Sequence, residues 1–189
     1  MKCKVIAITG KIGSGKSAVG DYLKDLDYSV VDCDQLSRQV ASSAEVLQKV
    51  ETLLGKQYVK NGKLNRSLIR DKIFSDATLY KQYNDIFLEQ IKNLLTTAVN
   101  QLGQSNDVVF VEIPLIDAFE FNWTEIWLVE SCDQTRYQRV AQRDGVSRDS
   151  VADISNKQNY VTQPTLVLHN DGTLSQLFSQ VDQALKFID

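Results

Sequence analysis

Short apolar runs alternate along the chain with segments whose apolar residues recur at helical spacing. The first run, residues 5–9, is β-branched apart from Ala7, which suits a strand buried on both faces of a parallel sheet. Four further strands are predicted at residues 28–34, 107–113, 125–131 and 165–169. Because strands of this kind alternate with helical patterns, we expect an α/β fold, a three-layer sandwich around a parallel five-stranded sheet.

The segment between the second and third predicted strands is too long to be a simple connection. Its apolar residues follow helical spacing, as in Leu47, Val50, Leu53 and Leu54, and no convincing strand is found in it. A crossover helix needs only about a dozen residues. We therefore predict a helical insert over residues 35–105, built to hold a bound molecule.

Two helical segments close the chain. Residues 134–160 have a helical pattern that carries several arginines, and we predict a lid over residues 137–164. The tail is amphipathic, with one apolar stripe of Leu174, Leu177, Phe178, Val181, Leu185 and Ile188, as in a helix docked on a sheet. The core of a single domain is then expected at residues 1–34, 106–136 and 165–189.

Composition narrows the class of protein. The 189 residues are 43% hydrophobic and 24% charged, with a net charge of −3, which argues against a protein that binds nucleic acid through bulk charge. No apolar run approaches the length of a membrane span. Cys3, Cys33 and Cys132 are far apart and show no metal-binding spacing. We expect reduced cysteines, a cytoplasmic location without membrane contact, and a monomer.

A glycine-rich loop follows the first predicted strand. Residues 10–17, GKIGSGKS, fit the pattern G-x-x-x-x-G-K-[ST], in which consecutive backbone N–H groups surround an anion. The strand before it and the helix after it are the required context. The sequence therefore predicts a loop that holds the phosphates of ATP with Mg²⁺. The residues expected to bind the nucleotide here are Gly10, Gly13, Ser14, Gly15, Lys16, Ser17 and Ala18, with Ser17 also as a metal ligand.

Two acids follow the second predicted strand. In an extended chain, Asp32 and Asp34 would face the same side, at the edge of a parallel sheet where ligands bind. One would accept a proton from an attacking hydroxyl while the other holds metal-bound water. Arg38, one turn later, would grip an acidic substrate. The alternative is that Asp34 is only the N-cap of the next helix.

Six blocks of the sequence, in order, resemble those of the dephospho-coenzyme A kinase family. ITGKIGSGKS (8–17) and VVDCDQLSRQV (30–40) resemble its phosphate loop and acidic motifs. The other four blocks are NGKLNRSLIRDKIFSD (61–76), VEIPLI (111–116), RVAQRDGVSRD (139–149) and VLHNDG (167–172). The resemblance implies a P-loop kinase fold and ATP-dependent phosphorylation of the ribose 3′-hydroxyl of dephospho-CoA.

The resemblance also implies roles for individual residues. It makes Asp34 the general base, with Asp32 beside metal or substrate and Lys16 on the phosphates. Arg139, Arg143 and Arg148 become lid residues that offset triphosphate charge, or else solvated helix arginines. Asn170, Asp171 and Gly172 fall where the adenine would rest, or form a plain turn. For the acceptor, the implied contacts are Arg66 and Arg70, which would otherwise only salt-bridge the insert, together with Pro114 and Leu115.

Three features depart from the family pattern. Lys11 replaces a glycine of the loop, the stretch 83–91 lacks the usual His-Pro pair, and NYVTQPT (159–165) is shorter than its counterpart and has no arginine. These departures keep two alternatives open: another small-molecule P-loop kinase of the nucleoside or nucleotide type, and a non-catalytic relative that binds ATP.

Overall fold

The chain divides into two compact units in a computed structural model that describes residues 3–73, 76–118, 120–145, 148–156 and 163–188. Unit 1 comprises residues 1–32 and 99–189, and unit 2 comprises residues 33–98. The predicted insert at 35–105 therefore overlaps unit 2, while the last residues of the long helix that ends it belong to unit 1.

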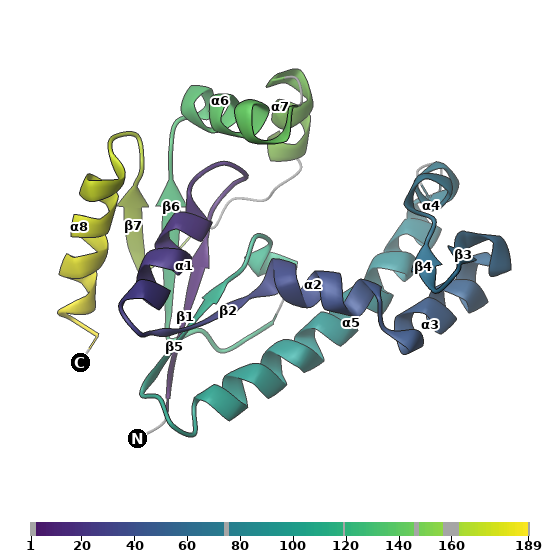
Figure 1. Cartoon of the computed structure of the whole chain (residues 1–189), viewed down its shortest axis with the longest axis horizontal. Coiled ribbons are helices and arrows are strands. Elements are labelled where there is room, and N and C mark those ends of the chain that lie inside the picture. The colour runs from purple at the N-terminus through teal and green to yellow at the C-terminus, as the bar shows by residue number, and fades with distance from the viewer. Residues whose placement is uncertain (1–2, 74–75, 119, 146–147, 157–162, 189) are drawn as a thin grey trace. The chain divides into compact units, whose positions relative to one another are not determined.

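Unit 1 is built on the predicted five-stranded sheet. All neighbouring strands are parallel, in the order β2-β5-β1-β6-β7 (Figure 1). The strands are β1 (Lys4–Thr9), β2 (Ser29–Asp32), β5 (Val108–Glu112), β6 (Glu125–Glu130) and β7 (Leu166–His169). The central strand β1 is buried from Val5 to Thr9, as expected for a parallel strand covered on both faces.

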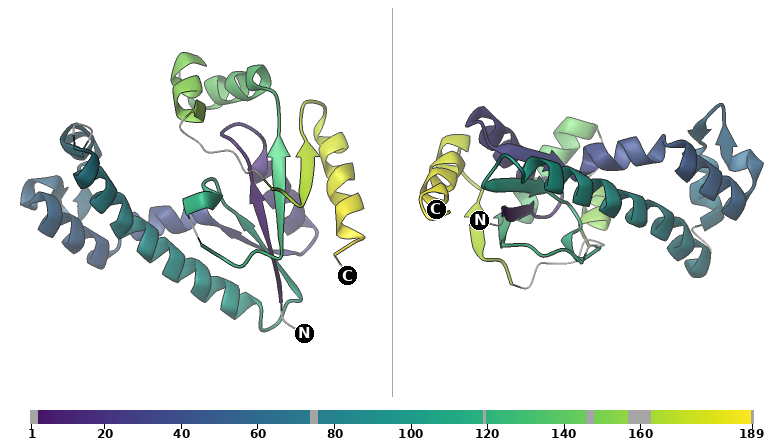
Figure 2. Two further views of the ribbon diagram at one scale, coloured as in Figure 1. Left: turned by 180° about the vertical axis from the view of Figure 1, so that it is seen from behind. Right: turned by 90° about the horizontal axis from the view of Figure 1, so that it is seen from below.

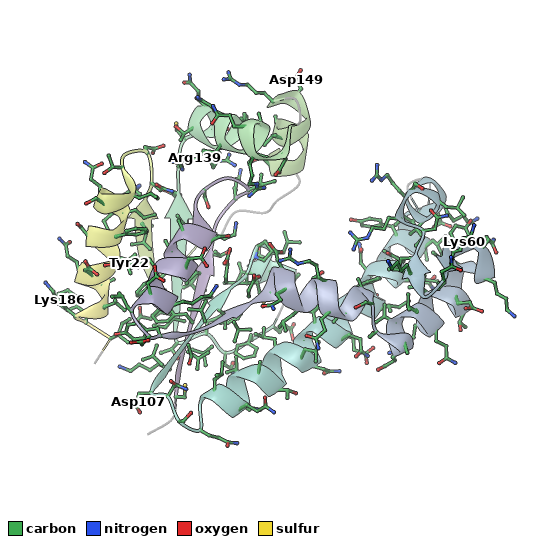
Figure 3. All side chains as sticks on the ribbon, in the orientation of Figure 1. Tyr22, Lys60, Asp107, Arg139, Asp149 and Lys186 are labelled. Atoms are coloured by element: carbon green, nitrogen blue, oxygen red, sulfur yellow. The ribbon has the colours of Figure 1, made fainter. Side chains whose placement is uncertain are left out.

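Helices α1 (Lys16–Asp25) and α8 (Leu174–Leu185) pack against one face of this sheet. The core that they share with the strands is large and apolar, and contains Ile6, Ile8, Val19, Leu23, Phe110, Trp127, Val129, Leu168, Leu177, Val181 and Ile188. Tyr22 of α1 stacks on Phe178 of α8 with 4.1 Å between ring centroids (Figure 3). Leu174, expected in the apolar stripe, is instead exposed because it occupies the first position of α8.

The arginine-rich segment folds as two helices and not as one. Helices α6 (Asp133–Asp144) and α7 (Arg148–Asn156) lie side by side (Figures 1 and 2). The helical pattern predicted over 134–160 is interrupted at Gly145, which ends α6 in the left-handed conformation, with φ 66°, a common way to stop a helix. Residues 146–147 and 157–162 of the predicted lid lie outside the described residues.

Unit 2 is mainly helical. It contains α2 (Cys33–Ala41), α3 (Ala44–Leu54), the short helix η1 (Lys56–Tyr58), α4 (Arg66–Ile73) and most of α5 (Ala77–Leu102). It also contains the hairpin β3 (Val59–Lys60) and β4 (Lys63–Leu64), which the expectation of no strand missed. Asn61 and Gly62 both have positive φ, 52° and 69°, as the two central residues of a tight hairpin turn require.

The second predicted strand is shorter than expected. It ends at Asp32, and α2 begins at the next residue, Cys33. Asp34 is therefore in the first turn of a helix, so the argument that an extended chain puts both carboxylates on the same side was wrong. The alternative, that Asp34 is the N-cap of this helix, was also wrong, because α2 already includes Asp34.

Within the part of the chain that the structure describes, no helix has both the length and the apolar character needed to cross a bilayer. In unit 1, the short helix η2 (Ile116–Ala118) follows β5.

Candidate functional site

The carboxyl end of β1 is the point where the chain switches from adding strands on one side of β1 to adding them on the other. From this central strand, β5 and β2 lie on one side, and β6 and β7 lie on the other. In open parallel sheets, ligands bind at this switch point, outside the carboxyl ends of the strands. The glycine-rich loop, residues 10–15, runs from the end of β1 to the start of α1, so it lies where a ligand is expected.

The loop needs its glycines because it is tightly enclosed. Gly13 and Gly15 have φ of 79° and 107°, in the left-handed region. A Cβ atom on Gly13 would lie 2.6 Å from the carbonyl oxygen of Arg136, and one on Gly15 would lie 2.1 Å from Nδ2 of Asn170. A side chain at either position would be strained by its backbone conformation and would collide with neighbouring atoms.

The N-terminus of α1 is available to an anion. Gly15 is its N-cap, no side chain caps it, and its first turn has no acidic residue. The first N–H groups of a helix have no intrahelical acceptor and carry the positive end of its dipole. The ammonium of Lys16 donates to the carbonyl oxygen of Gly10 at 2.8 Å. A positive charge therefore lies beside these N–H groups.

A carboxylate that the sequence analysis did not assign lies at the end of β5. The hydroxyl of Ser17 donates to Oε1 of Glu112 at 2.6 Å, and Glu112 is buried. In the sheet, Glu112 is the register partner of Asp32, the last residue of β2. Its position at the end of an apolar strand, in the block VEIPLI, was the signal that could have identified it.

This set of oxygen donors suits a small divalent cation. Mg²⁺ is commonly bound through one or two carboxylates, with the remaining positions taken by water and phosphate. Among the described residues, no group of three or more His, Cys, Asp or Glu side chains could hold a metal by itself. The hydroxyl of Ser17 and the carboxylates of Glu112 and Asp32 therefore fit an ion that arrives with phosphates, and do not form a closed metal cage.

Asn170 and Asp171 hold backbone groups around the loop. Nδ2 of Asn170 donates to the carbonyl oxygen of Ser14 at 2.7 Å, and Asn170 is buried. The carboxylate of Asp171 accepts hydrogen bonds from the backbone N–H of Cys132 and the hydroxyl of Ser131. These bonds lower the pKa of Asp171, and the bond from the Cys132 N–H has the larger effect. The block VLHNDG therefore fixes both the loop and the start of α6, and contact with adenine stays a prediction.

An open cavity adjoins the loop on the side of β6 and β7. Its lining includes Lys11, Ser14, Glu130, Asp133, His169 and Asp171. Oγ of Ser14 is the one buried side-chain oxygen or nitrogen without a hydrogen-bond partner among the described residues. A bound polar group would satisfy this hydroxyl. Lys11, the departure from the family loop, faces this cavity.

The predicted lid arginines differ in their contacts. The guanidinium of Arg139 (Figure 3) lies 3.5 Å from both Oγ of Ser131 and Oδ1 of Asn170. Arg143 is 64% exposed and pairs with the neighbouring carboxylate of Asp144, whose pKa this hydrogen bonding lowers. Arg148 begins α7 and is exposed. Arg139 thus lies at the loop, whereas Arg143 and Arg148 extend into solvent.

The remaining predicted residues are divided between the units. Asp34 and Arg38 lie on α2, and Arg66 and Arg70 lie on α4, all exposed in unit 2. In unit 1, Pro114 and Leu115 follow β5, and Leu115 is exposed. Gly172 belongs to the turn before α8. Their contacts with a substrate stay predictions.

Comparison with known proteins identifies relatives over nearly the whole chain. A family profile described as dephospho-CoA kinase matches residues 4–176. The dephospho-CoA kinase of Streptococcus pneumoniae is 31% identical over 189 aligned residues, covering 94% of this chain and 92% of that protein. The enzyme of Streptococcus mutans is 30% identical, covering 97% of this chain and 96% of its own.

Solved structures agree with the fold. A crystal structure of a Thermus thermophilus protein superposes with a TM-score of 0.85 at 29% identity and covers 98% of each chain. Dephospho-CoA kinase from Campylobacter jejuni has a TM-score of 0.71 at 17% identity, covering 97% of this chain and 96% of its own. At that identity, the second structure supports the fold alone.

Proposed function

The chain belongs to the dephospho-CoA kinase family, and from this premise we propose how its residues carry out ATP-dependent phosphorylation of the ribose 3′-hydroxyl of dephospho-CoA. The observation that carries the proposal is the loop of residues 10–17 at the switch point of the sheet. It combines the uncapped N-terminus of α1 with the ammonium of Lys16, which is held at the carbonyl oxygen of Gly10.

In this proposal, the loop positions the donor. Backbone N–H groups from Gly13 to Ala18 surround the outer phosphates of ATP, and Lys16 moves from the carbonyl oxygen of Gly10 to a phosphate oxygen. Catalysis by kinases rests almost entirely on positioning and on electrostatic stabilisation of the transferring group. Arg139 and Arg143 add positive charge on the side of α6.

Mg²⁺ would be held by the hydroxyl of Ser17, with the carboxylate of Glu112 beside it and Asp32 on the neighbouring strand. When bound, the ion neutralises charge on the two outer phosphates. Glu112 accepts the Ser17 hydroxyl proton in the 2.6 Å hydrogen bond, which leaves the oxygen lone pairs of Ser17 available to the ion.

On the acceptor side, Asp34 accepts the proton of the ribose hydroxyl as that oxygen attacks the γ-phosphorus in line. Arg38, Arg66 and Arg70 supply positive charge from unit 2 for the phosphates of dephospho-CoA. Pro114 and Leu115, after β5, offer an apolar surface to the acceptor. These assignments are supported by the motifs that the residues belong to and by the exposure of their side chains.

A panel of acceptors tests the proposal. The purified protein is given Mg-ATP with dephospho-CoA, or with nucleosides, nucleotides or shikimate, and the products are followed by mass. Product from dephospho-CoA that is lost in Lys16→Ala is expected. Product only from another acceptor would favour a kinase of a different small molecule. ATP binding with no product from any acceptor would favour a non-catalytic relative.

A further inference from the structure

Arg136 of α6 is a buried arginine that lines the cavity beside the loop and has no role in the nucleotide site described above. Its side chain is only 3% exposed, and a buried charge is costly unless hydrogen bonds and an opposite charge surround it. Three of the four groups that it contacts are backbone or hydroxyl oxygens, and the fourth is the carboxylate of Asp133. These oxygens belong to different segments of the chain.

One partner is the phosphate loop itself. Nη1 of Arg136 donates to the carbonyl oxygen of Ile12 at 3.0 Å. No described peptide bond is cis, and in a trans peptide the C=O and N–H groups point in opposite directions. Because the guanidinium holds the Ile12 carbonyl on the α6 side, the N–H of Gly13 in the same peptide points away from α6. The arginine thereby sets the direction of one loop N–H.

A second partner lies on α7. The same Nη1 donates to the hydroxyl of Ser155 at 3.1 Å, and Ser155 is fully buried. Ser155 is not among the residues that line the cavity beside the loop. Nε donates to the carbonyl oxygen of Ser131 at 3.2 Å, just before α6. One guanidinium thus joins the phosphate loop, the start of α6, and α7.

The remaining contact balances the charge. Nη2 of Arg136 pairs with Oδ1 of Asp133 in the first turn of α6. The hydrogen bond from Arg136, and to a smaller extent the charges of Arg136 and Lys11, lower the pKa of Asp133. An arginine has five N–H donors, and these contacts use four of them. Arg136 is therefore committed to the protein and is not a group that would bind a phosphate directly.

We propose that Arg136 is a positioning residue for the nucleotide: its guanidinium fixes the Ile12–Gly13 peptide of the phosphate loop and couples the loop to α7 through Ser155. The consequence is that the affinity for ATP depends on a buried hydroxyl of α7 that does not line the cavity. This inference rests on the proposed use of the loop for ATP, and it adds a residue that the motifs did not indicate.

The test is the affinity for ATP of Ser155→Ala, measured by calorimetry without acceptor. Loss of one partner frees the guanidinium from α7, and we expect ATP to bind about tenfold more weakly, with the KM for dephospho-CoA unchanged. Ser179→Ala is the matched control, because the Ser179 hydroxyl donates to a carbonyl oxygen within α8. It should leave the affinity for ATP unchanged.

Arg136→Lys extends the test. Lysine keeps the charge but cannot make the forked contacts, so ATP affinity should fall at least as far as in Ser155→Ala. In the double variant Arg136→Lys with Ser155→Ala, the affinity for ATP should fall little further than in Arg136→Lys alone, as expected for two partners of one contact. If Arg136→Lys does not fold, the Ser155→Ala result decides alone.

The outcomes separate this inference from the proposed function. A Ser155→Ala protein that loses thermal stability but binds ATP as the unmodified protein does would overturn the positioning role and leave Arg136 as a structural contact. An unmodified protein that binds ATP yet does not phosphorylate dephospho-CoA would contradict the proposed function alone. An unmodified protein that does not bind ATP would overturn both.

Discussion

At the scale of single residues, the phosphate loop is held in shape by side chains that lie outside it. Asn170 binds the carbonyl oxygen of Ser14, Arg136 binds that of Ile12, and Glu112 accepts a hydrogen bond from Ser17. Two of these bonds fix loop carbonyl groups from outside. Loop N–H groups that are held in place before a ligand arrives need no reorganisation when charge develops.

The sequence predicted the loop residues but not two of the side chains that support them. Gly10 to Ser17 follow a spacing that chemistry requires, and this spacing can be read directly. Glu112 was within a quoted block but its carboxylate went unassigned, because pairing with Ser17 depends on the sheet register. Arg136 is one of several arginines on a polar segment, and its burial cannot be seen in a single sequence.

Glu112→Gln tests the metal side of the site. Glutamine can still accept the hydrogen bond from Ser17 but has no charge, so we expect the Mg²⁺ concentration for half-maximal activity to rise about tenfold or more. Activity as a function of Mg²⁺ at saturating ATP is the measurement. Glu125→Gln is the matched control. Glu125 begins β6, at the amino ends of the strands, and accepts a hydrogen bond from the indole N–H of Trp127. Equal Mg²⁺ dependence in both variants would remove Glu112 from the metal site.

The lowered pKa of Asp171 predicts a pH-dependent contribution to stability. The folded protein favours the carboxylate through the N–H of Cys132 and the hydroxyl of Ser131. The contribution is complete above the ordinary aspartate pKa of about 4 and is lost as the pH falls through the lower pKa of the folded state. The melting temperatures of the unmodified protein and of Asp171→Asn should therefore differ at neutral pH and converge below about pH 4. Curves that stay parallel over this range would contradict the assignment.

At the scale of elements, the stacking of α8 on α1 shows how the C-terminal helix is held in unit 1. Tyr22 and Phe178 stack with an interplanar angle of 7°, and the hydroxyl of Tyr22 donates to Asp182 at 2.7 Å. This hydrogen bond raises the pKa of Tyr22. The helical pattern of the tail predicted a docked helix. The aromatic pair could not be predicted, because it joins residues 156 positions apart in the chain.

Phe178→Ala tests whether this packing is structural only. Loss of the ring removes buried apolar area and the stacked pair, so the free energy of unfolding should fall by about 2–3 kcal/mol. Affinity for ATP should stay the same, because α8 does not contribute to the loop. Phe187→Ala is the matched control, since Phe187 is 84% exposed. Denaturant unfolding followed by fluorescence gives the free energy of unfolding of each variant. A similar loss of that free energy in the two variants would contradict the account.

Two features of the elements have local causes that the patterns did not show. The pattern of residues 134–160 is helical, and α6 ends at the left-handed Gly145. In unit 2, the four strand residues of the β3–β4 hairpin are too few for an alternating pattern to be recognised, although Asn61-Gly62 is a strong turn signal. Long strands and helices were predictable, whereas breaks set by one or two residues were not.

At the scale of the whole molecule, the proposed roles are divided between two units. Unit 1 contains the sheet, the phosphate loop and the oxygen donors proposed for Mg²⁺, while unit 2 contains Asp34 and the arginines proposed to contact the acceptor. The order of six sequence blocks was enough to predict the fold and the family. The lining of the acceptor site could not be predicted, because it depends on side-chain positions that these blocks do not specify.

The measurement that tests this division most directly compares the unmodified protein with Asp34→Asn. ATP affinity is measured by calorimetry, and phosphoryl transfer to dephospho-CoA is measured in a single turnover by mass. The amide cannot accept the hydroxyl proton, so transfer should slow by about two or more orders of magnitude while ATP binds as tightly as before. Asp85→Asn, an exposed change on α5, should alter neither value. An Asp34→Asn protein that transfers phosphate at nearly the unmodified rate, or that loses ATP affinity along with transfer, would contradict the account.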